Sequence, residues 1–340
     1  MNPNEPPIID FAPFYANDST KEDLIHQIRR ACEQFGFFQL INHAIPTEQQ
    51  TAVLQHSSEF FNLPLETKEK YNQATGGFNR GYERLRPQNF EKRTKGDLKE
   101  GFYLGKDLPL DDAYVVQRRF GQGPNKYPSE VPDPKGFRRV MDEYHDAMIE
   151  LAVAIMQVIA HTLGLNEDFF GDFCDHPVSI LRLLHYPSQE ADASDLERGT
   201  KAGLGIGAHT DFGAITMLLQ DDTGGLQVWN NLSSEWVDVT PVPGAYVVNL
   251  GNMMMRWTNN RYLSNLHRVI NTSGKERYSI PFFFSGNPNH TIRCLPGCED
   301  EESARYPPIT VHEWMAGRYA DTYGTSDGKA IGDMRQEPGL

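Results

Sequence analysis

From residue 178 onward, the chain consists of short segments rich in strand-forming residues, separated by the turn-forming residues Gly, Pro, Asn and Asp. This pattern constrains the fold more than any other feature of the sequence. The runs are "VSILRLLHYP", "AITMLLQ", "GLQVW", "EWVDVTPVPGAYVVNLG", "SNLHRVI" and "ERYSIPFFF". Repeated short strands with turn signals between them are typical of a β-sandwich or a closed barrel. We therefore expect a mainly β fold for this half of the chain.

Helical patterns come mainly before residue 170. Residues 19–36 carry apolar side chains at helical spacing and end at a glycine, and residues 137–164 form the clearest helical pattern in the chain. A strand is expected at 37–43. Residues 72–100 are polar and charged with no clear period, which indicates a long surface connection such as a lid. The sequence thus predicts N-terminal helices followed by a β domain.

Composition narrows the classes of partner. The 340 residues carry a formal net charge of -14, which disfavours binding to nucleic acid. No apolar run approaches the roughly 20 residues that span a bilayer, and the start of the chain lacks a secretory pattern. Four scattered cysteines do not make a disulfide scaffold. We expect a cytoplasmic protein that acts on a small molecule, without nucleic acid or membrane partners; the sequence sets no oligomeric state.

A candidate metal site lies in "GAHTDFG". His209 and Asp211 are two positions apart, so on a strand both side chains point to the same face. A third ligand should come from a distant strand, and His267 in "SNLHRVI" is the best candidate, with His185 in "LLHYP" as its rival. Two imidazoles and one carboxylate suit a ferrous ion with open coordination positions, although zinc accepts the same ligands. The alternative is an ordinary pair of polar residues at a strand end.

A candidate anion site follows in "ERYSIPFFF". Arg277 and Ser279 are again two apart and share a strand face. A guanidinium beside a hydroxyl inside a barrel is costly unless an anion meets it, and a carboxylate held bidentately would satisfy both groups. The alternative is a surface ion pair between Arg277 and a protein carboxylate. Together the two sites suggest a keto dicarboxylate that chelates the metal at one end and is clamped at the other.

These residues carry a family resemblance. The matching segments are "ACEQFGFFQLINHAIP", "DLKEGFYLG", "ILRLLHYP", "HTDFGAITMLLQDDTGGLQV", "LSNLHRVI" and "RYSIPFFF". Over most of residues 7–290 the chain resembles the Fe(II)- and 2-oxoglutarate-dependent oxygenases of the isopenicillin N synthase-like family. It is particularly similar to fungal members such as thymine 7-hydroxylase. The resemblance implies a double-stranded β-helix (a jelly-roll barrel) with a helical N-terminal region.

The resemblance also implies roles for individual residues. His209, Asp211 and His267 match the iron ligands, while Arg277 and Ser279 match the pair that binds the far carboxylate of 2-oxoglutarate. Tyr186 matches a tyrosine that hydrogen-bonds this co-substrate in many members, the alternative being a core aromatic residue. The chain departs from the family pattern at Leu184, where many plant members carry Asn. It departs again at Asn252, where Asp is frequent.

The implied activity is that of a dioxygenase using Fe(II), 2-oxoglutarate and dioxygen. It would hydroxylate a small organic molecule, or desaturate or rearrange it, with succinate and carbon dioxide as co-products and a role in secondary metabolism. Substrate contacts are expected from Phe283, Leu184 and Arg182, which share the inward register of their strands. The alternatives are a ferrous oxidase of the same fold without 2-oxoglutarate, a non-catalytic small-molecule binding protein and a zinc hydrolase.

The expected organisation has three parts. Residues 1–120 form the N-terminal region, residues 121–300 form the barrel core with its long support helix, and residues 301–340 form a C-terminal tail or lid. Segments 72–105 and 315–340 are the expected lids over the site.

Overall fold

The protein is described by a computed structural model that covers residues 5–16, 20–85, 97–188, 204–271, 273–299 and 304–322. Its helices are α1 (Ala12–Ala16), α2 (Thr20–Gln34), α3 (Thr47–Phe61), α4 (Leu65–Glu69), α5 (Ala113–Val116), α6 (Pro134–Thr162), α7 (Gly171–Cys174), α9 (Asn252–Trp257) and α10 (Val311–Thr322). Its strands are β1 (Ile8–Asp10), β2 (Phe37–Ile41), β3 (Gly81–Glu83), β4 (Glu100–Gly105), β5 (Val178–Tyr186), β6 (Leu204–His209), β7 (Ile215–Gln220), β8 (Leu226–Asn230), β9 (Glu235–Asp238), β10 (Tyr246–Leu250), β11 (His267–Ile270), β12 (Arg277–Gly286), β13 (Thr291–Ile292) and β14 (Ile309–Thr310).

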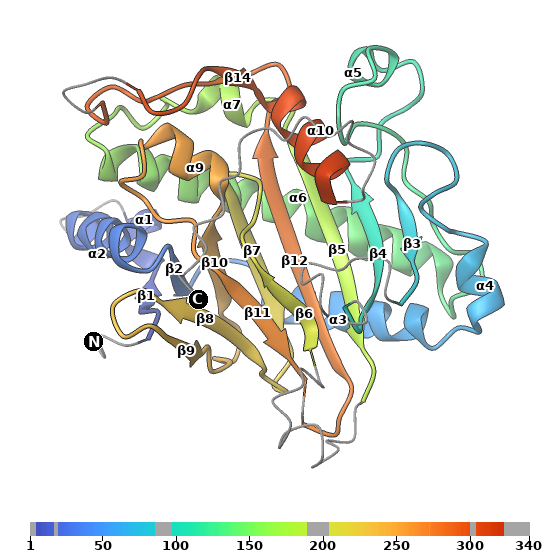
Figure 1. Cartoon of the computed structure of the whole chain (residues 1–340). Helices are drawn as coiled ribbons and strands as arrows, with labels where there is room; N and C mark the ends of the chain where they lie inside the picture. The colour runs from blue at the N-terminus through green and yellow to red at the C-terminus, as the bar shows by residue number, and fades with distance from the viewer. Residues whose placement is uncertain are drawn as a thin grey trace.

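Two sheets build the barrel (Figure 1). The larger sheet has the order β1-β2-β10-β7-β12-β5-β4-β3, and the smaller has the order β6-β11-β8-β9. All pairs are antiparallel except β1 with β2. Side chains from both sheets line one cavity. The expected jelly-roll barrel with N-terminal helices is confirmed.

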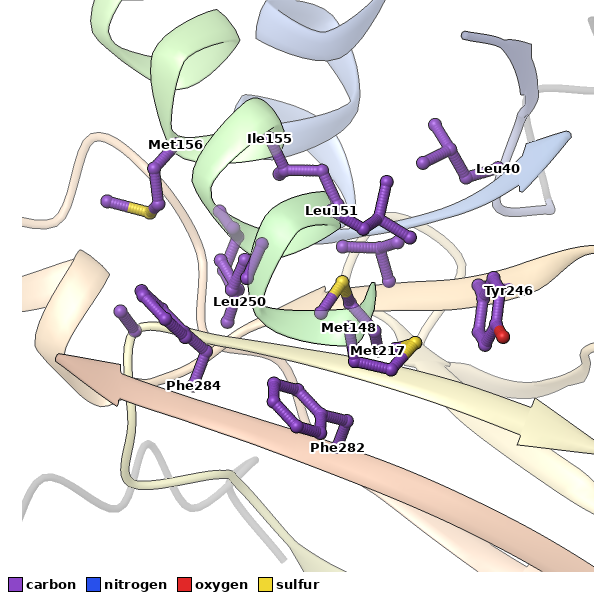
Figure 2. Packing of buried hydrophobic residues seen from close by; sticks show 14 of the residues in the cluster. Leu40, Met148, Leu151, Ile155, Met156, Met217, Tyr246, Leu250, Phe282 and Phe284 are labelled. Atoms are coloured by element: carbon purple, nitrogen blue, oxygen red, sulfur yellow. The ribbon is translucent and has the colours of Figure 1, made fainter. Parts of the chain in front are cut away.

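The long helix α6 supports the larger sheet from outside the barrel (Figures 1 and 2). It starts where the Asp133 carboxylate accepts a hydrogen bond from the Gly136 backbone N–H, with Pro134 in the first turn. It stops before Gly164, whose φ of +73° lies in the left-handed region that favours glycine. The helix thus spans nearly the residues that the apolar pattern predicts.

Alternate side chains of strand β12 point in opposite directions, one set into the hydrophobic core and the other into the cavity. Phe282 and Phe284 are fully buried and face α6, where Figure 2 shows them beneath Met148 and Ile155. Ser279, Pro281 and Phe283, the alternate residues, line the cavity instead. One face of the strand therefore packs in the hydrophobic core and stabilises the fold, and the other face is free to line a binding site.

The expectation of a surface connection over residues 72–100 is wrong in part. Strand β3 is buried and pairs with β4, which pairs in turn with β5, so both strands extend the larger sheet. The charged side chains of Glu83, Lys99 and Glu100 hid this burial, because each is neutralised by partners distant in sequence. Residues 86–96 and 323–340 of the expected lids lie outside the described residues. The division at residues 120 and 300 stays a prediction.

Among the described helices, none is both long and apolar enough to cross a membrane.

Candidate metal and co-substrate site

The three expected metal ligands meet at one point between the sheets. His209 ends β6, His267 begins β11, and the two residues are paired across the smaller sheet with ring centroids 4.2 Å apart. The Asp211 Oδ1 atom lies 3.8 Å from the Nε2 atom of each imidazole. One ligand atom from each of the three residues lies within 4.8 Å of the other two, and no other group of this kind occurs among the described residues.

The rival ligand His185 lies elsewhere. It is adjacent to Tyr186 on β5, so its side chain points to the opposite face of the strand. Its Nδ1 atom is 2.8 Å from Glu100 Oε1, and its ring stacks on Tyr278. His185 therefore belongs to a structural network outside the cavity.

Hydrogen bonds orient each ligand toward the shared point. His209 Nδ1 lies 2.8 Å from the Gly207 carbonyl oxygen, which leaves Nε2 as the atom directed at Asp211. The second oxygen of Asp211, Oδ2, accepts hydrogen bonds from Thr216 Oγ1 at 2.6 Å and Asn249 Nδ2 at 2.7 Å. Outer contacts of this kind fix the tautomer of a ligating histidine and the rotamer of a ligating carboxylate.

The protonation states suit metal binding. Burial, together with the neighbouring His267, lowers the pKa of His209 to about 3, so this imidazole is neutral near pH 7. Burial raises the pKa of Asp211, but the two imidazoles and the hydrogen bonds from Asn249 and Thr216 outweigh it and hold this pKa below its ordinary value. A neutral imidazole and an ionised carboxylate are the forms that bind metals. The donor set therefore fits a ferrous ion.

We expect the substitution Asn249→Ala to weaken Fe(II) binding by about 10- to 100-fold, because it removes one of two donors that orient the Asp211 carboxylate. Anaerobic titration of the metal-free protein with Fe(II) measures the change. Asn271→Ala is the matched control, since Asn271 is equally buried but bonds the backbone of the turn before β12. Equal Fe(II) affinity in the two variants would contradict this role of Asn249.

The expected anion clamp lies in the same cavity. Arg277 is fully buried and donates hydrogen bonds to the Gly224 carbonyl at 2.7 Å, to Ser279 Oγ at 3.0 Å and to Gln220 Oε1 at 3.2 Å. None of these partners is a carboxylate, and no described acidic residue forms an ion pair with Arg277. A buried cation with only neutral partners is stabilised when an anion binds beside it. The arrangement fits the far carboxylate of 2-oxoglutarate and disagrees with a surface ion pair.

Tyr186 lies beside the clamp. Its ring is 4.8 Å from the Arg277 guanidinium, and the two residues are paired across β5 and β12. Burial raises the pKa of Tyr186, so the hydroxyl keeps its proton and can donate to an anion. The clamp and the metal ligands line one cavity of about 110 Å³.

The expected substrate contacts line the other part of this cavity. Leu184, Arg182 and Phe283 all contribute to its wall. Leu184 packs in a small apolar cluster with Tyr186, which accounts for an apolar residue at this position. Asn252, the second departure, is fully buried and its amide bridges Ser264 Oγ at 3.1 Å and Thr210 Oγ1 at 3.3 Å. A carboxylate could not donate these hydrogen bonds.

Several residues of the site carry no local signal in the sequence. Thr216 and Asn249 are paired across β7 and β10. The sequence could have indicated them only through the alternation of inward and outward side chains along each strand. Met315 and Tyr319 reach the cavity from α10, which is held by a hydrogen bond from Trp314 Nε1 to the Phe212 carbonyl at 2.8 Å. Part of the expected C-terminal lid, 315–322, thus lies over the cavity.

Comparison with known proteins finds one family model that matches the N-terminal part of the chain and a second that matches the barrel. Residues 6–130 match the family described as non-haem dioxygenase in morphine synthesis N-terminal, and residues 177–286 match the 2OG-Fe(II) oxygenase superfamily. The chain is 50% identical to the 2-oxoglutarate-Fe(II) type oxidoreductase hxnY of Emericella nidulans, covering 96% of this chain and 93% of that protein. It is 36% identical to the clavatol oxidase claD of Penicillium crustosum, covering 93% and 96%.

A solved structure agrees with the fold. The crystal structure of the full-length thymine 7-hydroxylase of Neurospora crassa in complex with alpha-KG and thymine superposes with a TM-score of 0.83 at 30% identity, covering 95% of this chain and 99% of that chain. That protein binds 2-oxoglutarate together with a small molecule. The chain described here belongs to the 2OG-Fe(II) oxygenase superfamily and is an oxidoreductase that uses Fe(II) and 2-oxoglutarate as a dioxygenase.

Proposed function

We propose that His209, Asp211 and His267 bind the ferrous ion and that Arg277, Ser279 and Tyr186 bind 2-oxoglutarate. The observation that carries this assignment is the fully buried Arg277, whose partners among the described residues are all neutral and which shares one cavity with the three ligands. An anion at the clamp balances the guanidinium, and the same molecule can reach the metal through its keto acid end.

The side chains position the reactants and keep water away. Arg277 and Ser279 bind the far carboxylate, and the Tyr186 hydroxyl donates to the co-substrate. Thr216 and Asn249 hold Oδ2 of Asp211, so that Oδ1 keeps its direction toward the metal. When bound, the ferrous ion and 2-oxoglutarate supply the oxidising power, with dioxygen consumed and 2-oxoglutarate converted to succinate and carbon dioxide.

The substrate is a small organic molecule, and the reaction is a hydroxylation or one of its variants, desaturation or ring rearrangement. Support comes from the apolar walls of the cavity around Leu184 and Phe283, beside the polar Arg182. Support also comes from similar proteins, one of which binds thymine and another of which is named for clavatol. We place the enzyme in secondary metabolism on the same grounds.

The test is release of labelled carbon dioxide from 2-oxoglutarate while candidate small molecules are screened. We expect release that depends on Fe(II) and dioxygen and that rises when a substrate is present. Succinate formation separates this reaction from that of a ferrous oxidase without 2-oxoglutarate. An iron-loaded enzyme that no candidate class stimulates, and that binds no 2-oxoglutarate, would contradict the assignment.

A further inference from the structure

A glutamine beside the clamp has no role in the proposed function. On β7, Thr216 and Leu218 line the cavity, and Gln220 follows at the next position of the same face. Gln220 is also paired with Ser279 across β7 and β12, and directly paired residues of antiparallel strands point to the same side of the sheet. Both relations direct the Gln220 side chain into the barrel, next to the clamp.

The amide of Gln220 is oriented by Arg277. Arg277 Nη2 donates a hydrogen bond to Gln220 Oε1 at 3.2 Å. A guanidinium carries donors and no acceptor, so the amide oxygen must face Arg277 and the amide nitrogen must point away from it. Nε2 is buried and hydrogen-bonds to none of the described residues. Among these residues, Arg277 is therefore the one partner of the side-chain amide, which ties the place of Gln220 in the structure to the clamp.

Gln220 also helps to fix the plane of the guanidinium. The Gly224 carbonyl accepts from Nε at 2.7 Å, Ser279 Oγ accepts from Nη1 at 3.0 Å, and Gln220 holds Nη2. A guanidinium has five N–H donors, so these three contacts leave one N–H on each terminal nitrogen. A pair of N–H groups of this kind is what a carboxylate binds bidentately. Loss of the Gln220 contact would release Nη2 and with it the orientation of this pair.

Gln220 holds Arg277 without cancelling its charge. A glutamate of the same length at this position would be ionised beside the guanidinium and would form a buried ion pair with it. The far carboxylate of 2-oxoglutarate would then meet a cation that is already paired, with a like charge beside it. The change from glutamine to glutamate alters one charge in contact with Arg277 and leaves the other charges of the site as they are, so its effect does not depend on their sum.

We propose that Gln220 is a positioning residue of the co-substrate site, which orients Arg277 while leaving it charged and thereby sets the preference for a keto dicarboxylate over a keto monocarboxylate. Gln220 acts through Arg277. The inference rests on the proposed function in taking 2-oxoglutarate as the ligand of the clamp.

The experiment measures binding of two keto acids to protein loaded with Zn(II), which accepts the same ligands and supports no turnover. 2-Oxoglutarate carries the far carboxylate and 2-oxobutanoate lacks it, so the ratio of the two Kd values from calorimetric titration reports on the clamp. We expect Gln220→Glu to raise the Kd of 2-oxoglutarate at least about tenfold and to leave that of 2-oxobutanoate within about threefold of wild type. Gln220→Met, which removes the acceptor but adds no charge, should raise the Kd of 2-oxoglutarate about three- to tenfold.

The matched control is Gln227→Glu, the same chemical change beside another arginine. Gln227 Oε1 accepts a hydrogen bond from Arg268 Nε at 2.8 Å. Gln227 follows the cavity-lining Leu226 on β8, so its side chain points out of the barrel. We expect this variant to bind both keto acids as the wild-type protein does.

The inference is overturned if Gln220→Glu binds 2-oxoglutarate within about threefold of wild type, if it loses affinity for both keto acids equally, or if Gln227→Glu shows the same loss. Should Gln220→Glu fail to fold, Gln220→Met decides, and unchanged affinity for 2-oxoglutarate in that variant overturns the inference. Failure of the proposed function looks different, because wild-type protein would then bind no 2-oxoglutarate or Arg277→Gln would bind it as tightly as wild type. Weaker binding in Arg277→Gln, with wild-type binding in Gln220→Glu, would overturn the inference alone.

Discussion

Replacing Asp211 with alanine is expected to abolish both iron binding and turnover of 2-oxoglutarate. The substitution removes the one carboxylate of the proposed ligand set and leaves two imidazoles, so the site loses both its negative charge and one of the three proposed bonds to Fe(II). Loss of an outer contact already costs about 10- to 100-fold, so we expect kcat/KM to fall by at least about 1,000-fold when a ligand is lost. Metal analysis after anaerobic loading and carbon dioxide release measure the two effects.

The matched control for this prediction is Asp238→Ala. Asp238 lies on β9 of the same smaller sheet, is exposed, and accepts a hydrogen bond from Gln227. We expect this variant to bind one iron per chain and to turn over 2-oxoglutarate as the wild-type protein does. Stoichiometric iron in Asp211→Ala, with turnover within about tenfold of wild type, would exclude Asp211 as a ligand.

Replacing Arg277 with glutamine is expected to raise the KM for 2-oxoglutarate by about 100-fold or more. Breaking a buried ion pair by removing one partner costs about 3–5 kcal/mol, because the other charge stays buried without compensation. Glutamine keeps a polar side chain beside Gly224 and Gln220, so the change acts mainly on the charge. Steady-state carbon dioxide release at varied 2-oxoglutarate measures the effect.

The control for this second prediction is a change of co-substrate. 2-Oxobutanoate keeps the keto acid end that reaches the metal but lacks the far carboxylate. Wild-type protein and Arg277→Gln should therefore use it with similar, low efficiency. A KM for 2-oxoglutarate within about threefold of wild type in the variant would contradict the clamp.

Periodicity in the sequence predicted the elements well where one face of each was apolar. The apolar stripe of residues 137–164 became α6, and the alternating runs after residue 178 became the strands of the barrel. The spacing of two that joins His209 to Asp211, and Arg277 to Ser279, places each pair toward the same interior. These relations are local, because the backbone repeat alone decides which side chains share a face.

Periodicity failed where burial depends on distant charge partners. Glu83 on β3, Lys99 just before β4 and Glu100 at its start are charged residues, whose type alone predicts exposure. In the fold, each is buried against a partner from another strand or helix, such as Arg182 on β5 or Lys68 on α4. No local sequence pattern predicts that these charges will be neutralised by residues distant in the chain.

The sequence by itself determined the class of fold and the pairs of polar residues that share a strand face, and the family resemblance predicted His209, Asp211 and His267 as the metal ligands. The tertiary structure then excluded the rival His185, because strand pairing brings His267 opposite His209, whereas His185 lies on the face of β5 opposite to that of Tyr186. It alone also brought Asn249 and Thr216 to one carboxylate oxygen, and Glu83 to Arg182. Contacts between strands far apart in the chain depend on sheet order, which short-range spacing does not encode.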